Sequence, residues 1–219
     1  MNNLTNLLKK EFTLAMHPTA IIFPLLSLLV FVPNYPYEVT FFFTTLSIFF
    51  ISLQGRENDD LFFSATLPVS KGEIVSARIF TIVTLELLQM LLLTIFSIIK
   101  TFTMPSAVNL AGLEANVALI AFGFMIYGTF NLTFITRYFK YPTKVGSTFI
   151  ISTIFTFVII SLSITLCFAF PDYAINVDVN DLTNTTAKWI LVALGLIVYL
   201  VFTILSSKIA VKRFEKVDL

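Results

Sequence analysis

The sequence predicts an all-α integral membrane protein with six transmembrane helices, and two observations indicate this fold class. First, the 219-residue chain is 57% hydrophobic and 12% charged, whereas soluble domains average about 25% charged and about 45–50% apolar residues. Second, apolar runs recur along the chain at close to the ~20 residues that a membrane-spanning helix needs. We place the spans at about 19–36, 39–54, 79–99, 116–136, 146–170 and 189–207. The lipid membrane is therefore the solvent of most of this chain, which we interpret as a single transmembrane domain, residues 1–219.

The distribution of basic residues predicts the orientation of the spans. Lys and Arg gather on the cytoplasmic side of membrane proteins. If both termini are cytoplasmic, then of the 14 Lys and Arg residues only Lys100 and Lys188 fall outside. The first span is the least regular, because Pro24, Pro33 and Pro36 interrupt it. We expect a multi-pass protein with both termini cytoplasmic.

The N-terminal residues 1–17 form a separate element. Their leucines and Phe12 gather towards one side of a helix, whereas Lys9, Lys10 and Glu11 lie elsewhere. This pattern is typical of an interfacial helix that lies in the headgroup layer with its apolar side towards lipid. A simple anchor before the first span is the alternative.

Several classes of function lack the residues they need. A net charge of +1 disfavours a nucleic-acid partner, which requires a basic surface. The single cysteine, Cys167, and the single histidine, His17, supply neither a metal site nor a nucleophile with its base. The nearest match to a phosphate-binding loop, Gly123 to Gly128, lacks the lysine of that motif. We therefore expect no catalytic, cofactor-binding or metal-binding residues on this chain.

The cytoplasmic loop at 57–78 is the densest charged segment. After Pro68, Ser70 and Glu73 have the spacing of a capping box, in which each side chain accepts a hydrogen bond from the other's backbone N–H. The third transmembrane helix should thus begin in the cytoplasm and place Arg78 at the headgroup level.

A short helix is predicted in the same loop, upstream of Pro68. Asn58 or Asp59 can cap it, and it should end at about Thr66, because proline disfavours helical geometry in the residue before it. A helix of two or three turns is marginal alone in water, so it needs a surface to lie on. That surface is either the lipid interface or a groove on another protein.

This order of elements resembles the membrane subunit of ABC-2-type exporters. The resemblance rests on Leu67-Pro68-Val69-Ser70-Lys71, followed by Ile74-Val75 and Arg78, together with the six spans and the N-terminal helix. A narrower resemblance is to small permeases of bacterial peptide exporters, such as that of the phenol-soluble-modulin exporter.

The resemblance implies a coupling helix that docks on a separate ABC ATPase subunit, which would bind ATP and Mg²⁺. Phe62 and Phe63 would be its main anchors, and the full set of docking residues would be Asn58, Asp59, Asp60, Leu61, Phe62, Phe63 and Thr66. It also implies a second permease copy, identical or related, and the bacterial cytoplasmic membrane. The chain would form the membrane path for an amphipathic or hydrophobic substrate, with peptide as the favoured class.

Glu86 is the one charge inside the predicted spans. It lies about 12 Å along the helix from Arg78, at a depth where an ionised carboxylate is costly. Gln89 is one turn away on the same helix, and Asn131 should lie at a similar depth. These three residues either line a polar path or dimer interface, or Glu86 is satisfied by a single neighbouring helix. Two other functions remain open: a membrane sensor or immunity subunit that moves no cargo, and a membrane-embedded enzyme.

Overall fold

The fold is helical throughout the part of the chain that the structure describes. The computed structural model describes residues 3–105, 108–170 and 185–217, and every regular element within these ranges is a helix. Among them, five are long and apolar enough to cross a membrane: α3 (Val39–Glu57), α5 (Lys71–Thr103), α6 (Val117–Tyr138), α7 (Val145–Ala169) and α9 (Thr185–Phe214). This confirms the predicted all-α class and indicates a multi-pass membrane protein.

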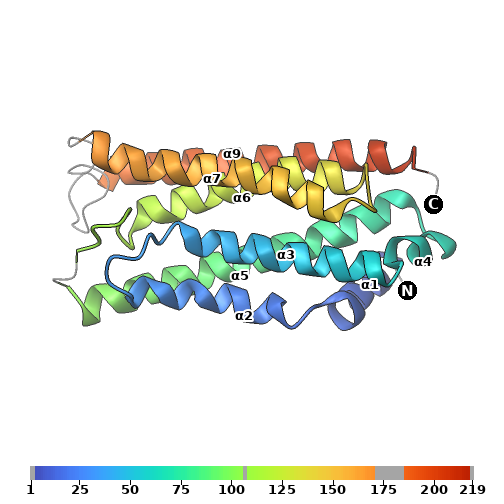
Figure 1. The fold of residues 1–219 in the computed structure, drawn as a ribbon, viewed down its shortest axis with the longest axis horizontal. Coiled ribbons are helices and arrows are strands. Elements are labelled where there is room, and N and C mark those ends of the chain that lie inside the picture. The colour runs from blue at the N-terminus through green and yellow to red at the C-terminus, as the bar shows by residue number, and fades with distance from the viewer. Residues whose placement is uncertain (1–2, 106–107, 171–184, 218–219) are drawn as a thin grey trace.

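The first predicted span is shorter and less regular than the sequence indicated. It consists of α2 (Thr19–Leu25), which continues as the 3₁₀ helix η2 (Leu26–Phe31), and the chain becomes extended at Val32. Pro24 lacks a backbone N–H, and the 3₁₀ geometry begins two residues after it. The segment therefore ends five residues before the predicted boundary at 36, and by length it is not counted with the five long helices. It lies alongside α3 (Figure 1).

The helices form two layers (Figure 1). One layer holds α6, α7 and α9, and the other holds α2, α3 and α5. The N-terminal helix α1 (Asn3–Lys10), the short helix α4 (Asp60–Thr66) and the C-terminal end of α9 lie at the same end of the bundle (Figure 1). At that end Lys71 Nζ donates to the carbonyl oxygen of Val217 (2.7 Å), which ties the start of α5 to the segment after α9.

Two glycines let α6 and α9 pack closely. A Cβ added to Gly195 of α9 would lie 2.4 Å from the carbonyl oxygen of Ala121, and one added to Gly128 of α6 would lie 2.9 Å from the Cα of Tyr199. Small residues at such contacts allow close backbone approach between membrane helices. As a result, α6 and α9 form the most extensive helix pair in the bundle.

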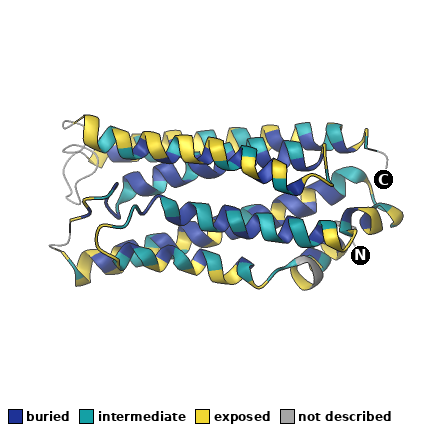
Figure 2. Cartoon of the chain, viewed as in Figure 1, coloured by how far each residue is buried: buried dark blue, intermediate teal, exposed yellow. Residues whose placement is uncertain are grey.

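Exposure follows the layers. Along α7 and α9, exposed positions lie on the side that faces away from the other helices (Figure 2). The exposed apolar side chains of these two helices include Phe155 and Leu194. The buried residues face the inside of the bundle, and they include the aromatic side chains Phe41, Tyr127 and Phe130. This distribution suits a chain surrounded by lipid, because lipid covers apolar outer surface without cost.

At the end opposite α4, the last turns of α5 are held by a loop. Lys100 Nζ donates to the Tyr37 hydroxyl (2.8 Å) and lies 3.5 Å from a carboxylate oxygen of Glu114. Lys100 is 3% exposed because these partners cover it. This end of α5 is therefore closed by the segment that precedes α6.

Candidate functional site

The short helix predicted before Pro68 is present as α4. It begins after Asp59, which adopts a left-handed backbone conformation (φ 50°), and it ends at Thr66. Asp59 occupies the N-cap position without a side-chain capping bond. Leu67 is extended (ψ 157°), as expected for the residue before a proline. The length of α4 thus matches the prediction.

The capping box at the start of α5 is also present. The Ser70 hydroxyl accepts from the backbone N–H of Glu73, and the Glu73 carboxylate accepts from the backbone N–H of Ser70 (2.7 Å). This fixes Lys71 as the first residue of α5 and places the helix start well before the apolar run that begins at Ile79.

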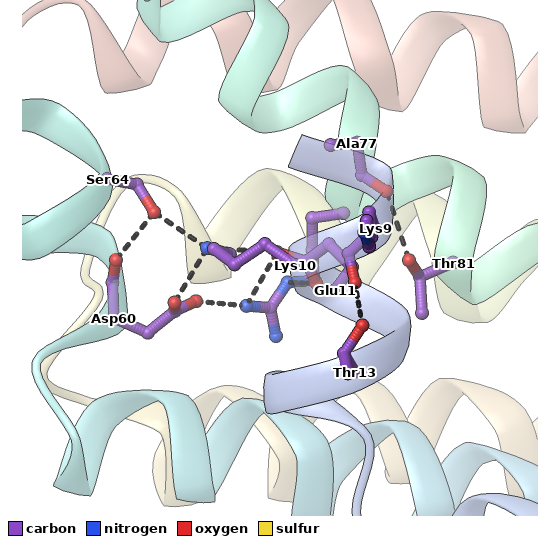
Figure 3. A network of polar contacts seen from close by, with 9 residues as sticks. Lys9, Lys10, Glu11, Thr13, Asp60, Ser64, Ala77 and Thr81 are labelled. Carbon is purple, nitrogen blue, oxygen red and sulfur yellow. Dashed lines mark hydrogen bonds and ion pairs between the residues drawn. The ribbon is translucent and has the colours of Figure 1, made fainter. Parts of the chain in front are cut away.

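Buried polar contacts fix α4 to the N-terminal helix (Figure 3). Lys10 Nζ lies 2.6 Å from Asp60 Oδ1 and donates to the Ser64 hydroxyl (2.7 Å), which in turn donates to the Asp60 carbonyl oxygen (2.7 Å). Ser64 is fully buried and Leu61 nearly so. One face of α4 is therefore held against α1.

Arg78 of α5 completes this cluster. Its Nη2 lies 2.6 Å from Asp60 Oδ2, and its Nε lies 2.9 Å from Glu11 Oε2, in the π-helical turn η1 (Glu11–Ala15) that follows α1. Arg78 is 1% exposed and Glu11 is 2% exposed. Two cations and two anions thus join α1, α4 and α5, and we call Lys10, Glu11, Asp60 and Arg78 the charged cluster.

The charged cluster contains two features that the sequence did not predict. The sequence indicated only the depth of Arg78, at the headgroup level, and did not predict that protein would enclose its side chain. Glu11 was expected on the polar side of an interfacial helix, but it turns inward to Arg78. Nothing in the local sequence indicated these contacts, because α2, η2, α3 and α4 all lie between Glu11 and Arg78 along the chain.

The opposite face of α4 is exposed and apolar. Phe62 and Phe63 are 53% and 55% exposed. Phe62 also lines a small pocket of about 90 Å³ between α3, α4, the end of α6 and the α6–α7 turn. The other residues that line it are Gly55, Arg56, Asp59, Leu61, Tyr138, Pro142 and Thr143. Phe62 and Phe63, which we call the phenylalanine pair, are thus presented by a helix whose other face is fixed.

The α6–α7 turn beside this pocket is basic. Lys140 and Lys144 lie over the Tyr141 ring, with Nζ 4.7 and 5.8 Å from the ring centre. A hydrogen bond with Lys140 and the charge of that residue hold the pKa of the Tyr141 hydroxyl below its usual range. Any partner at this end of the bundle therefore meets aromatic groups next to positive charge.

The three polar residues predicted within the spans lie deep inside the chain. Glu86, Gln89 and Asn131 are each 0% exposed. Asn131 Nδ2 donates to Glu86 Oε2 (3.0 Å) and to the Thr203 hydroxyl (3.1 Å), and the Tyr199 hydroxyl donates to Glu86 Oε2 (2.8 Å). The contact between α5, α6 and α9 is polar at this depth, and we call Glu86, Asn131 and Tyr199 the membrane cluster.

Gln89 has separate partners one turn away. Its Nε2 donates to the carbonyl oxygen of Thr40 (2.8 Å), and its Oε1 accepts from the Tyr127 hydroxyl. The structure therefore brings Glu86 and Asn131 into direct contact, whereas Gln89 joins α3 to α6. Tyr127 and Tyr199 were not predicted, because a tyrosine in a membrane helix carries no sign of which face it occupies.

Comparison with known protein families identifies the family to which the chain belongs. The family described as "ABC-2 family transporter protein" matches residues 6–215. The chain belongs to the ABC-2 transporter family. The match spans all the helices that could cross a membrane, and ABC-2 membership indicates a permease of an ABC transporter. Permeases of this family generally work with ATPase subunits in the membrane.

The match is to the ABC-2 family as a whole. It gives no support to the narrower resemblance to the phenol-soluble-modulin exporter. Searches among curated proteins and among solved structures gave no match.

Proposed function

We propose that the chain is the permease subunit of an ABC exporter and that α4 is the helix through which it couples to a separate ATPase subunit. The observation that carries this proposal is the two-sided character of α4. Its inner face is fixed by the buried charged cluster, and its outer face exposes the phenylalanine pair. Exposed apolar groups on a fixed element are typical of protein interaction sites.

A protein partner suits α4 better than a lipid surface. The helix lies at the tip of the bundle, beyond the ends of the long helices (Figure 1). Asp59, just before α4, is acidic and exposed, and it disfavours contact with anionic headgroups. The pocket beside Phe62 offers a partner side chain a place between α4 and the α6–α7 turn.

The orientation of the chain follows from the same proposal. If α4 meets an ATPase, its end of the bundle is cytoplasmic, and α1 and the end of α9 are cytoplasmic with it (Figure 1). The segment Thr19–Phe31 would then make the first of six passes. With 3₁₀ geometry in its second half, it covers ~22 Å, so Val32 and the following residues would complete the crossing.

In this function the partner ATPase binds ATP and Mg²⁺, and this chain contributes no catalytic residue. Two permease copies, identical or related, form the path in a bacterial cytoplasmic membrane. The substrate is amphipathic or hydrophobic, with peptide as the class we favour, since phenylalanine is abundant along the spans, with 25 residues in the chain. The dimer and the substrate are inferred from family resemblance and composition.

The experiment that tests the coupling role is co-purification of the tagged permease with co-expressed ABC ATPase subunits of the same organism. The double variant Phe62→Ala with Phe63→Ala should weaken the association at least ~30-fold, because aromatic anchors commonly contribute ~2 kcal/mol or more to an interface. Insertion of the permease in the membrane should not change.

A matched control is the double variant Phe102→Ala with Phe170→Ala. These phenylalanines are 81% and 56% exposed. Phe102 lies in the last turn of α5 and Phe170 directly follows α7, and these helix ends are at the end of the bundle opposite α4 (Figure 1). This variant should bind the ATPase normally. Equal binding by both double variants would contradict the coupling role of α4. ATP-driven uptake of a labelled hydrophobic peptide into inside-out vesicles would then separate an exporter from a membrane sensor that moves no cargo.

A further inference from the structure

Glu86 is a carboxyl group without a charged partner in the middle of the membrane helices. It is 0% exposed and lies near the centre of the 33-residue helix α5. Its hydrogen-bond partners are the Asn131 amide on α6 and the Tyr199 hydroxyl on α9. Gln89 on α5 and Tyr127 on α6 are the nearby polar groups one turn away. Within residues 3–105, 108–170 and 185–217, no Lys or Arg forms an ion pair with Glu86.

Two oxygen atoms of this cluster have no hydrogen-bond partner. They are Glu86 Oε1 and Asn131 Oδ1, and both are buried. An ionised carboxylate and an amide oxygen only accept hydrogen bonds. These two oxygen atoms therefore cannot form a hydrogen bond with each other while Glu86 is ionised. The two side chains are joined only through Asn131 Nδ2 and Glu86 Oε2. Buried polar atoms without partners are rare because they are costly.

A single proton would satisfy both atoms. We propose that Glu86 is a proton-binding site, with the proton carried on Oε1 and donated to the amide oxygen of Asn131. The acid and the amide would then share two hydrogen bonds, one in each direction, while Tyr199 continues to donate to Oε2. The site is uncharged in this state, which removes the cost of an isolated carboxylate in an apolar environment.

The bound proton contributes to the contact between the two helix layers. Glu86 belongs to the layer of α2, α3 and α5, and Asn131 and Tyr199 belong to the layer of α6, α7 and α9 (Figure 1). The second hydrogen bond of the acid–amide pair therefore forms across the boundary between the layers. This inference concerns the chain alone and does not depend on the proposed export function.

Infrared spectroscopy of the purified protein in lipid vesicles at neutral pH tests the proposal. A protonated carboxylic acid gives a C=O stretching band at higher frequency than the bands of carboxylates, and the band shifts down in D₂O. The wild-type protein should show this band, and Glu86→Gln should lose it. The control variant Glu114→Gln, which changes a buried carboxylate beside Lys100, should keep it.

Each other outcome overturns the proposal. A wild-type spectrum without the band would mean that Glu86 is ionised and that its unpaired oxygen is satisfied by a water molecule or a cation. A band that survives in Glu86→Gln belongs to another residue. If Glu86→Gln does not fold, Glu86→Asp serves instead, because the shorter acid should change the frequency of the same band, and an unchanged frequency would also contradict the assignment.

Discussion

The charged cluster at the tip of the bundle and the membrane cluster near its middle each join three helical elements, yet they do so with different chemistry. At the tip, Lys10 and Arg78 balance Glu11 and Asp60. In the middle, a single acid meets an amide and a hydroxyl. Where water is close, buried charges are balanced by opposite charges. Where lipid surrounds the bundle, the acid has only neutral hydrogen-bonding partners.

This comparison predicts that the charged cluster is the more sensitive of the two to substitution. Arg78→Met should lower the free energy of unfolding by about 3–5 kcal/mol, because it leaves the buried Glu11 and the partly buried Asp60 with Lys10 as their one remaining cation in the charged cluster, so that one negative charge is unbalanced. The measurement is reversible unfolding in mixed detergent, followed by circular dichroism.

Arg56→Met is the matched control for Arg78→Met. Arg56 pairs with Glu57 at the surface, where their side chains are 36% and 63% exposed, and exposed pairs contribute about 0–1 kcal/mol. Similar losses for the two arginine variants would mean that burial does not distinguish the charged cluster from a surface ion pair.

A smaller loss of stability is expected when the close packing of α9 on α6, which positions the membrane cluster, is disturbed. Gly195→Ala should cost about 1–3 kcal/mol, because its Cβ would lie 2.4 Å from the Ala121 carbonyl oxygen and would push α9 away from α6. The contact between α5 and these two helices should loosen with it, because Asn131 and Tyr199 come from α6 and α9.

The control for this packing effect is Gly146→Ala. A Cβ at Gly146 meets nothing within 4 Å, and alanine is the better helix former by up to about 1 kcal/mol. This variant should be neutral or slightly more stable in the same unfolding measurement. A loss equal to that of Gly195→Ala would argue against close packing as the cause.

The smallest effect is expected for one hydrogen bond of the membrane cluster. Tyr199→Phe removes the hydroxyl that donates to Glu86 and keeps the ring. Hydrogen bonds between membrane helices contribute about 0.6 kcal/mol on average and at most about 1.7 kcal/mol. Tyr199→Phe should therefore lower the free energy of unfolding by an amount within this range. Tyr141→Phe, at the exposed α6–α7 turn, is the control. A loss for Tyr199→Phe as large as that for Arg78→Met would remove the distinction between the clusters.

The sequence was sufficient for features that depend on neighbouring residues. The apolar runs located the five long helices, the Ser70–Glu73 spacing located the start of α5, and Pro68 located the end of α4. The similar depth of Glu86 and Asn131 also followed from counting residues along two helices, and these side chains are in contact.

The structural features that could not be predicted from the sequence depend on which helix faces pack against each other. The sequence around Lys10 and Glu11 looks the same whether these residues lie on an exposed helix surface or form ion pairs inside the protein. The packing of α1 against α4 and α5 decides between these two arrangements. Pro24 indicated that the first span is irregular, but it did not indicate that the second half of Thr19–Phe31 adopts 3₁₀ geometry. The short helix that carries the phenylalanine pair could be predicted because Asp59 and Pro68 delimit it in the sequence, and the family resemblance singled out Phe62 and Phe63 within it.

The position of Glu86 also has a mechanical consequence. It lies about halfway along α5, which at 1.5 Å per residue is ~50 Å long. Because α5 is held near its midpoint, it would pivot there when it tilts. A tilt of about 10° would move the two ends of α5 by ~4 Å in opposite directions. A displacement of α5 near Arg78 would thus move Lys100, and the loop that covers it, in the opposite direction.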